Sequence, residues 1–89
     1  MGEMNIKIKL MPSSPDVNLE EIKSKAKELV EKEKGKSVNF QEEEIAFGLK
    51  SLIVSFILSE NEELEIIENK LSDLDSVNSA EMIDIRRAL

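Results

Sequence analysis

The chain has 89 residues and carries 19 acidic against 12 basic side chains, which gives a formal net charge of −7 at pH 7. This acidic balance argues against a nucleic-acid ligand, because nucleic-acid binding calls for a basic face. The sequence contains no His, Cys or Tyr. Imidazole and thiolate chemistry are therefore excluded, and we expect no catalytic residue, no metal site and no cofactor.

Targeting signals are absent from the pattern. No run of 18 apolar residues predicts a membrane span, and no charged segment leads into an apolar one at the start of the chain. We expect one cytoplasmic domain over residues 1–89, without a membrane partner.

The first half of the chain predicts a strand, a helix and a second strand. Apolar and lysine side chains alternate over 5–11, which is typical of a half-buried strand. Asn18 is expected to begin a helix, accepting from the Glu21 N–H in a capping box that Glu21 completes. Gly35 is expected to end this helix. The apolar stripe of the helix recurs every three or four residues: Leu19, Ile22, Ala26, Leu29 and Val30. A second strand is predicted over 36–44.

The second half predicts a central strand, a helix and a last strand. Residues 49–58 are apolar on both faces, as in a strand with neighbours on either side. Residues 59–63 are expected to cap a helix that carries apolar residues to Leu74. The strand over 76–87 has two competing inward sets: Val77, Ile83 and Ile85, or Ala80 and Met82. The element order predicts an α+β, ferredoxin-like βαββαβ sandwich, with two helices on one face of a four-stranded antiparallel sheet.

Two features do not fit a structural role alone. Phe47 lies between Ala46 and Gly48, in the expected connection between two strands. It either folds back over the end of the sheet or forms an aromatic tip that anchors a partner. Arg86 and Arg87 place a basic pair at the end of an acidic chain, either as a charged strand end or as a contact.

Four segments make the chain resemble archaeal elongation factor 1-beta. They are Ile6-Lys-Ile-Lys-Leu-Met-Pro12, Ser14-Pro-Asp-Val-Asn-Leu-Glu20, Ile45-Ala-Phe-Gly-Leu-Lys50 and the stretch from Val77 through the ending Asp84-Ile-Arg-Arg87. The resemblance covers essentially the whole chain. It implies a guanine-nucleotide exchange factor, not an enzyme, that promotes GDP-for-GTP exchange on the GTPase elongation factor 1-alpha by binding its nucleotide-free state.

The resemblance also implies which residues meet the GTPase. In eukaryotic relatives the matching loop is Gly-Phe-Gly and its Phe inserts into the GTPase, so Ala46, Phe47 and Gly48, with Lys50 after them, are expected to bind the partner. Those relatives also place a Lys, one residue from their terminus, at the Mg²⁺ and phosphate site of the GTPase. Counted without gaps, Arg87 occupies that position, with Arg86 beside it.

A rival interpretation comes from another class of protein. Ferredoxin-like regulatory modules sense small molecules and act as dimers paired edge to edge, whereas the exchange factor is expected to be a monomer when free. A third interpretation, a structural subunit, predicts binding to the GTPase with no effect on its nucleotide.

Overall fold

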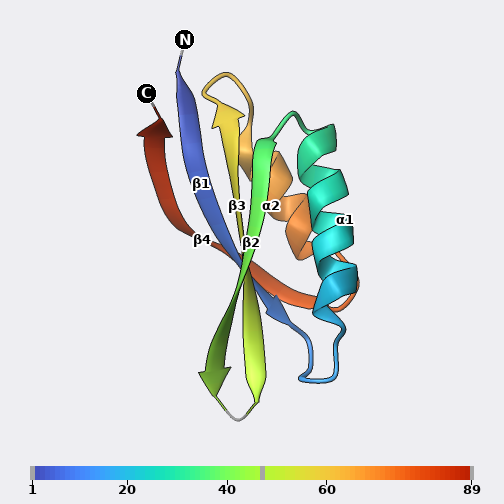
Figure 1. Cartoon of the computed structure of the whole chain (residues 1–89). Coiled ribbons are helices and arrows are strands. Elements are labelled where there is room, and N and C mark those ends of the chain that lie inside the picture. The colour runs from blue at the N-terminus through green and yellow to red at the C-terminus, as the bar shows by residue number, and fades with distance from the viewer. Residues whose placement is uncertain (1, 47, 89) are drawn as a thin grey trace.

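A computed structural model describes residues 2–46 and 48–88, and its elements follow the order β-α-β-β-α-β (Figure 1). They are β1 (Glu3–Pro12), α1 (Leu19–Lys32), β2 (Lys36–Ala46), β3 (Leu49–Ser59), α2 (Leu64–Ser72) and β4 (Val77–Ala88). The strands pair antiparallel in the order β2-β3-β1-β4. Both helices cover the same face of this sheet (Figure 1). The predicted α+β, ferredoxin-like fold is confirmed.

The core lies between the helices and the inner face of the two central strands. β1 alternates as predicted, with every second side chain buried, whereas β3 buries its inward side chains and also Ser51 and Ile53 of the opposite face, as expected for a central strand. The helices supply the opposing layer through Ile22, Ala26 and Val30 of α1, and through Ile67 and Leu71 of α2. Each fully buried aliphatic side chain contributes about 1.5–3 kcal/mol to folding. Among the described residues, no helix is long and apolar enough to cross a membrane.

Helix α1 begins at Asn18 as predicted, but the capping box is wrong. The Asn18 side chain accepts a hydrogen bond from the Glu20 N–H at 3.0 Å, not from the Glu21 N–H. The Glu21 N–H donates instead to the Asn18 carbonyl oxygen at 3.2 Å. The second N–H of a helix is as good a donor to a short cap side chain as the third, so the cap forms without a reciprocal bond from Glu21.

The end of α1 is a Schellman motif in which the predicted stop, Gly35, has a different role from the expected one. The Gly35 N–H donates to the Val30 carbonyl at 2.8 Å, and the Lys34 N–H donates to the Glu31 carbonyl at 3.1 Å. Lys34, with φ 74°, is the left-handed residue of this motif. Gly35 is required for space, because an added Cβ would clash with Val30 Cγ1 and lie 3.0 Å from the Val30 carbonyl oxygen.

Helix α2 also differs from its prediction at both ends. Its N-cap is Glu63, whose side chain makes no capping bond, while Ser59 accepts from the Asn61 N–H at 3.3 Å within the preceding turn. Residues 59–63 therefore form a turn without capping the helix through a side chain. Leu74 lies beyond the end of α2 and still packs against the core.

The connection expected between the second and third strands is largely strand. β2 continues to Ala46, which pairs with Leu49 of β3. β1 follows β3 only as far as the pair Leu10–Leu52. Beyond this pair β2 and β3 continue alone as a two-stranded ribbon, residues 43–46 and 49–51, which projects from the sheet (Figure 1).

The structure shows which residues of β4 lie opposite the inward side chains of β1. The alternation of β4 between the two faces changes at two points. Against β1, two residues of β4 have no opposite residue, Asn78 and Ile83. Such bulges insert one extra residue and reverse the alternation beyond it. Each of the two competing apolar sets was therefore partly right. The residues opposite the inward side chains of β1 are Val77, Ala80, Met82, Ile85 and Arg87.

We predict that Gly35→Ala lowers the free energy of unfolding by about 1–3 kcal/mol, because the new methyl group overpacks Val30. The neighbouring Lys34→Gly should be neutral or stabilising by up to about 1 kcal/mol, since glycine adopts a positive φ without steric cost. Denaturant unfolding of both variants checks the pair. Equal destabilisation by the two substitutions would contradict this account of the helix end.

Candidate functional site

The tip of the ribbon contains three of the residues predicted to bind a partner. Phe47 lies outside the described residues, so the choice between core and tip stays a prediction. Ala46 ends β2 and pairs with Leu49. Gly48 has φ +79°, a conformation that side-chain-bearing residues rarely adopt, and, its two chain neighbours aside, no atom of the described residues lies within 4 Å of the place where its Cβ would be. The backbone at Gly48 is therefore open to close approach.

The two C-terminal arginines lie on opposite sides of the sheet, as expected for neighbours on a strand. Arg87 is opposite Met4, which packs against the core, and its Nε lies 3.0 Å from Glu60 Oε1. Arg86 is opposite Asn5 on the uncovered face, and its Nε lies 3.1 Å from Asp84 Oδ2. Both guanidinium groups are about three-quarters exposed. The two positions therefore have different surroundings.

The tip and the arginines are at opposite ends of the molecule. Arg86 shares a row of the sheet with Ile57 of β3, and Ile57 is eight residues from Leu49. At about 3.3 Å per residue the two regions are separated by ~26 Å, within a molecule whose long axis measures 43 Å. The sequence-predicted site residues thus form two groups, with Lys50 in the tip group, and no small ligand could touch both.

A groove runs beside the ribbon. Its volume is about 420 Å³, and it separates the ribbon from the segment that joins β1 to α1. Gly48, Lys50 and Glu42 line one side, while Pro15 and Asn18 contribute to the other. One wall therefore contains two of the predicted partner-binding residues.

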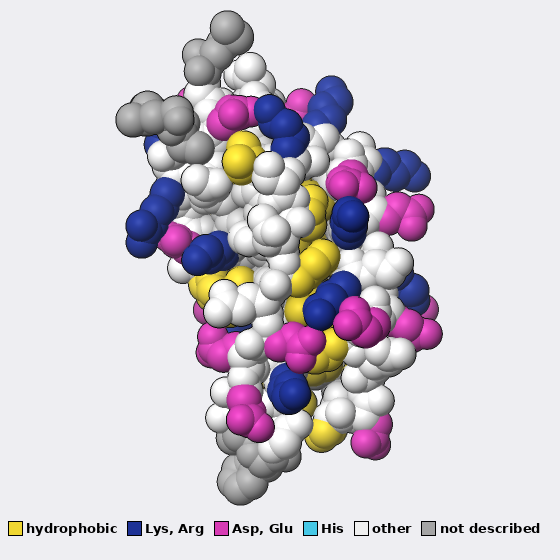
Figure 2. All heavy atoms as spheres, in the orientation of Figure 1, with side chains coloured by type: hydrophobic (Ala, Val, Ile, Leu, Met, Phe, Trp, Pro, Cys, Tyr) yellow, Lys and Arg dark blue, Asp and Glu magenta, His cyan; other side chains and the backbone are white. Residues whose placement is uncertain are grey.

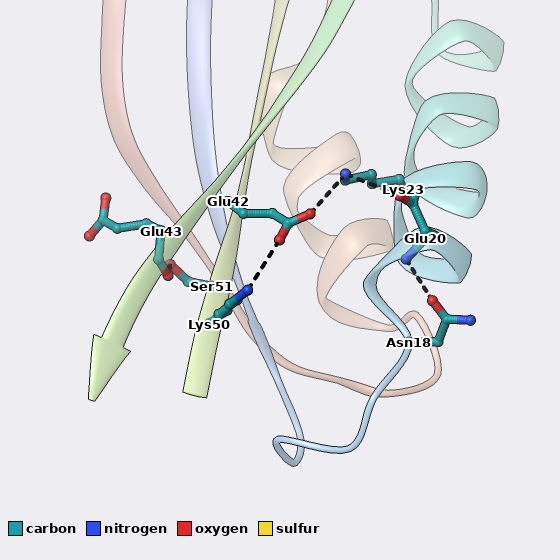
Figure 3. A network of polar contacts seen from close by, with 7 residues as sticks. All are labelled: Asn18, Glu20, Lys23, Glu42, Glu43, Lys50 and Ser51. Carbon is teal, nitrogen blue, oxygen red and sulfur yellow. Dashed lines mark hydrogen bonds and ion pairs between the residues drawn. The ribbon is translucent and has the colours of Figure 1, made fainter. Parts of the chain in front are cut away.

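A network of polar contacts crosses the base of this groove (Figure 3). Lys23 of α1 donates a hydrogen bond to Glu42 Oε2 at 3.0 Å, and Lys50 Nζ lies 4.0 Å from Glu42 Oε1. Lys23 also lies 3.6 Å from Glu20, whose N–H donates to the Asn18 cap. The hydrogen bond from Lys23 holds the pKa of the Glu42 carboxyl below its usual 4.5 and raises the pKa of Lys23.

This network is visible in the sequence only when the strand phase of β2 is extended past Phe40. Val38, Phe40 and Glu42 alternate on one face of β2, and the first two pack against the core. The same phase directs Glu42 toward α1, where its side chain is still 38% exposed. Its neighbour Glu43 points to the other face, where Lys9 Nζ lies 3.9 Å away. Among the described residues, no group of His, Cys, Asp or Glu side chains could hold a metal ion.

The visible surface is mixed in charge. Figure 2 shows acidic and basic side chains interspersed over this face, with hydrophobic side chains gathered in a line between the sheet and α1. The fold and its two exposed ends define a small α+β domain of the ferredoxin-like class.

The comparisons with known proteins go further. Residues 5–88 match the EF-1 guanine nucleotide exchange domain. The chain is 38% identical to elongation factor 1-beta of Methanocaldococcus jannaschii over 99% of this chain and 100% of that protein. For the proteins of the same name from Methanococcus vannielii and Methanosarcina barkeri the identities are 40% and 36%, over at least 96% of each chain. The chain belongs to the elongation factor 1-beta family of guanine nucleotide exchange domains.

We predict that the Glu42 carboxyl titrates below pH 4.5, and that Lys23→Met moves its midpoint up toward that value. Because the pKa is lowered in the folded state, the ionised carboxylate stabilises the fold above the unfolded pKa. This contribution is lost as the pH falls through the folded pKa. Carbon-detected NMR titration of the glutamate carboxyls measures both midpoints. An unchanged midpoint in Lys23→Met would show that this bond does not persist in solution.

Proposed function

We propose that this protein promotes exchange of GDP for GTP on elongation factor 1-alpha by binding the nucleotide-free GTPase. Family membership over nearly the full chain is the observation that carries the proposal. A partner that binds the nucleotide-free state more tightly than the GDP state must weaken GDP binding by the same factor. Residues 1–89 would act as one exchange domain, cytoplasmic and monomeric when free.

The separation of the two candidate regions supports a macromolecular partner. A single surface that touches both the ribbon tip and the arginines must extend over ~26 Å, which a GTPase can provide and a metabolite cannot. The net charge of −7 would steer the factor toward a basic partner surface and raise the association rate.

The proposal gives each predicted site residue a role. Phe47 would anchor the complex, with Ala46 and Gly48 keeping the tip narrow and Lys50 flanking it. Arg86 and Arg87 would act at the phosphate end of the GTPase. The contact of Arg87 with Glu60 does not prevent this, because an exposed ion pair is worth at most about 1 kcal/mol.

The direct test is stopped-flow release of labelled GDP from elongation factor 1-alpha, measured with increasing concentrations of the protein. Faster release that saturates is the expected result. Binding without acceleration would point to a structural subunit. A dimer that shows no GTPase binding and holds a small ligand between subunits would favour the regulatory module.

We predict that Phe47→Ala keeps the fold and loses affinity for the GTPase. A side chain at a loop tip should cost under about 1 kcal/mol of folding stability when truncated, whereas a core Phe costs about 3–5 kcal/mol. An interface anchor should cost about 2 kcal/mol or more of binding. Denaturant unfolding and titration calorimetry on the same variant measure the two quantities. Phe56, which is buried in the core, provides the matched comparison. Phe56→Ala should cost about 3–5 kcal/mol of folding stability.

We predict that Arg87→Ala slows GDP release at saturating factor more than Arg86→Ala does, while both variants still bind. The two side chains lie on opposite sides of β4, so only one can meet the phosphate site in a given complex. A guanidinium bridges phosphate oxygens through its planar fork, so Arg87→Lys should keep part of the activity. Release rates over a range of Mg²⁺ concentrations provide the measurement. A slower Arg86→Ala variant would assign the role to the other face.

A further inference from the structure

We propose that Glu42 is a positioning residue, whose contacts with Lys23 and Lys50 fix the angle of the ribbon against helix α1. The consequence for partner binding rests on the proposed function, because it supposes that the ribbon tip meets the GTPase. The structural part of the inference does not need that supposition and can be tested on the isolated protein.

The ribbon needs such a support because it has lost its third strand. Beyond the pair Leu10–Leu52, each strand of the ribbon has a single neighbour. Two strands alone are marginally stable in water, and packing against a helix or further strands is what holds such a hairpin. The contacts within the ribbon, such as the bond from the buried Ser51 Oγ to the Glu43 carbonyl at 3.4 Å, join the two strands but do not attach them to the sheet.

The groove removes support on the helix side. Its 420 Å³ lie between the ribbon, at Gly48 and Lys50, and the segment that precedes α1, so this space separates the two there. On the other face, Lys9 Nζ of β1 lies 3.9 Å from Glu43 Oε1 of the ribbon, a separation similar to the 4.0 Å between Lys50 Nζ and Glu42 Oε1. The shortest contact between a charged side chain at the base of the ribbon and the rest of the molecule is the 3.0 Å bond from Lys23 to Glu42.

Glu42 lies at the base of the ribbon, where a contact with α1 can fix the angle of the ribbon. It pairs with Leu52 in the last row of the sheet that β1 still reaches. Its two carboxylate oxygens face different elements, Oε2 toward Lys23 on α1 and Oε1 toward Lys50 in the ribbon (Figure 3). One side chain therefore connects the helix to the projecting strands.

Because the ribbon is long, a small rotation at its base displaces its tip by a larger distance. Ala46 is four residues from Glu42, a distance of ~13 Å along the strand. A rotation of ~10° at the base would move the tip by about 2 Å, and binding constellations have to be held to within about 0.5 Å. A loss of the Glu42 contacts is therefore expected to weaken partner binding without any change at the tip itself.

The first experiment measures the ribbon directly. The chain contains no cysteine, so spin labels can be attached specifically to Ser24→Cys on α1 and Ile45→Cys on the ribbon, both exposed positions. Pulsed electron paramagnetic resonance then gives the distribution of distances between them. Glu42→Gln, and separately Lys23→Met, should broaden this distribution. Glu44→Gln, which removes the same charge two residues further along the strand, should leave it unchanged.

The second experiment, without the labels, measures binding and release. Glu42→Gln should lower the affinity for elongation factor 1-alpha about two- to fivefold, as expected from one exposed ion pair. The release rate of GDP at saturating factor should stay at its wild-type value, because the tip residues are intact. Adding Lys23→Met to Glu42→Gln should produce no further loss, since both act through one contact. Glu44→Gln again serves as the control for the change in net charge.

The outcomes separate the two proposals. If the wild-type protein does not accelerate GDP release, the proposed function fails, while the distance distribution still decides whether Glu42 positions the ribbon. If Glu42→Gln leaves the distribution at its wild-type width, the positioning role is overturned, whatever its effect on unfolding. A broadened distribution with unchanged affinity would overturn the link between the ribbon angle and partner binding.

Discussion

The fold depends on one constraint: the two helices cover only one face of the sheet, over a core centred on β1 and β3 that reaches the edge strands at Phe40 of β2 and Val77 of β4. β1 and β3 carry the fully buried rows, with Ile8 facing Val54 and Ile6 facing Phe56. The edge strands β2 and β4 are held through these two. The ends of the edge strands therefore lie outside the covered area, and both candidate regions are found there, on Gly48 at one end and on Arg86 and Arg87 at the other.

This arrangement explains which parts of the fold the sequence could predict. Residues 5–11 and 49–58 have one periodicity from end to end, because they are central strands without bulges in their mutual register. β4 could not be assigned a face, since its unmatched residues at 78 and 83 reverse the alternation. Nothing in the local sequence marks a bulge, which forms to fit the neighbouring strand. Asn18 was predicted as a cap from its type, but its donor depends on local geometry.

The candidate site, like the fold, could be predicted from the sequence only in part. Arg86 and Arg87 lie on opposite sides of the sheet, and this follows from strand geometry alone. Their separation from the tip follows from the antiparallel register. The strand predicted over 36–44 contains Glu42, and the phase that Glu42 shares with Phe40 places it on the helix side. The sequence alone does not show that Lys23, nineteen residues earlier in the chain, lies within hydrogen-bond distance of Glu42.

The extra residue at Ile83 has a further consequence for how this chain can vary in length. Because β4 is an edge strand, a residue gained or lost at that point needs no change in Val77 or Ala80, which pack against the core. Deleting Ile83, which has no opposite residue on β1, would also leave Arg86 opposite Asn5 and Arg87 opposite Met4, so each arginine would keep its side of the sheet. The stretch from the core to the arginines would nevertheless be one residue shorter, so that in this family an alignment that counts back from the last residue and one that counts forward from the core need not select the same arginine.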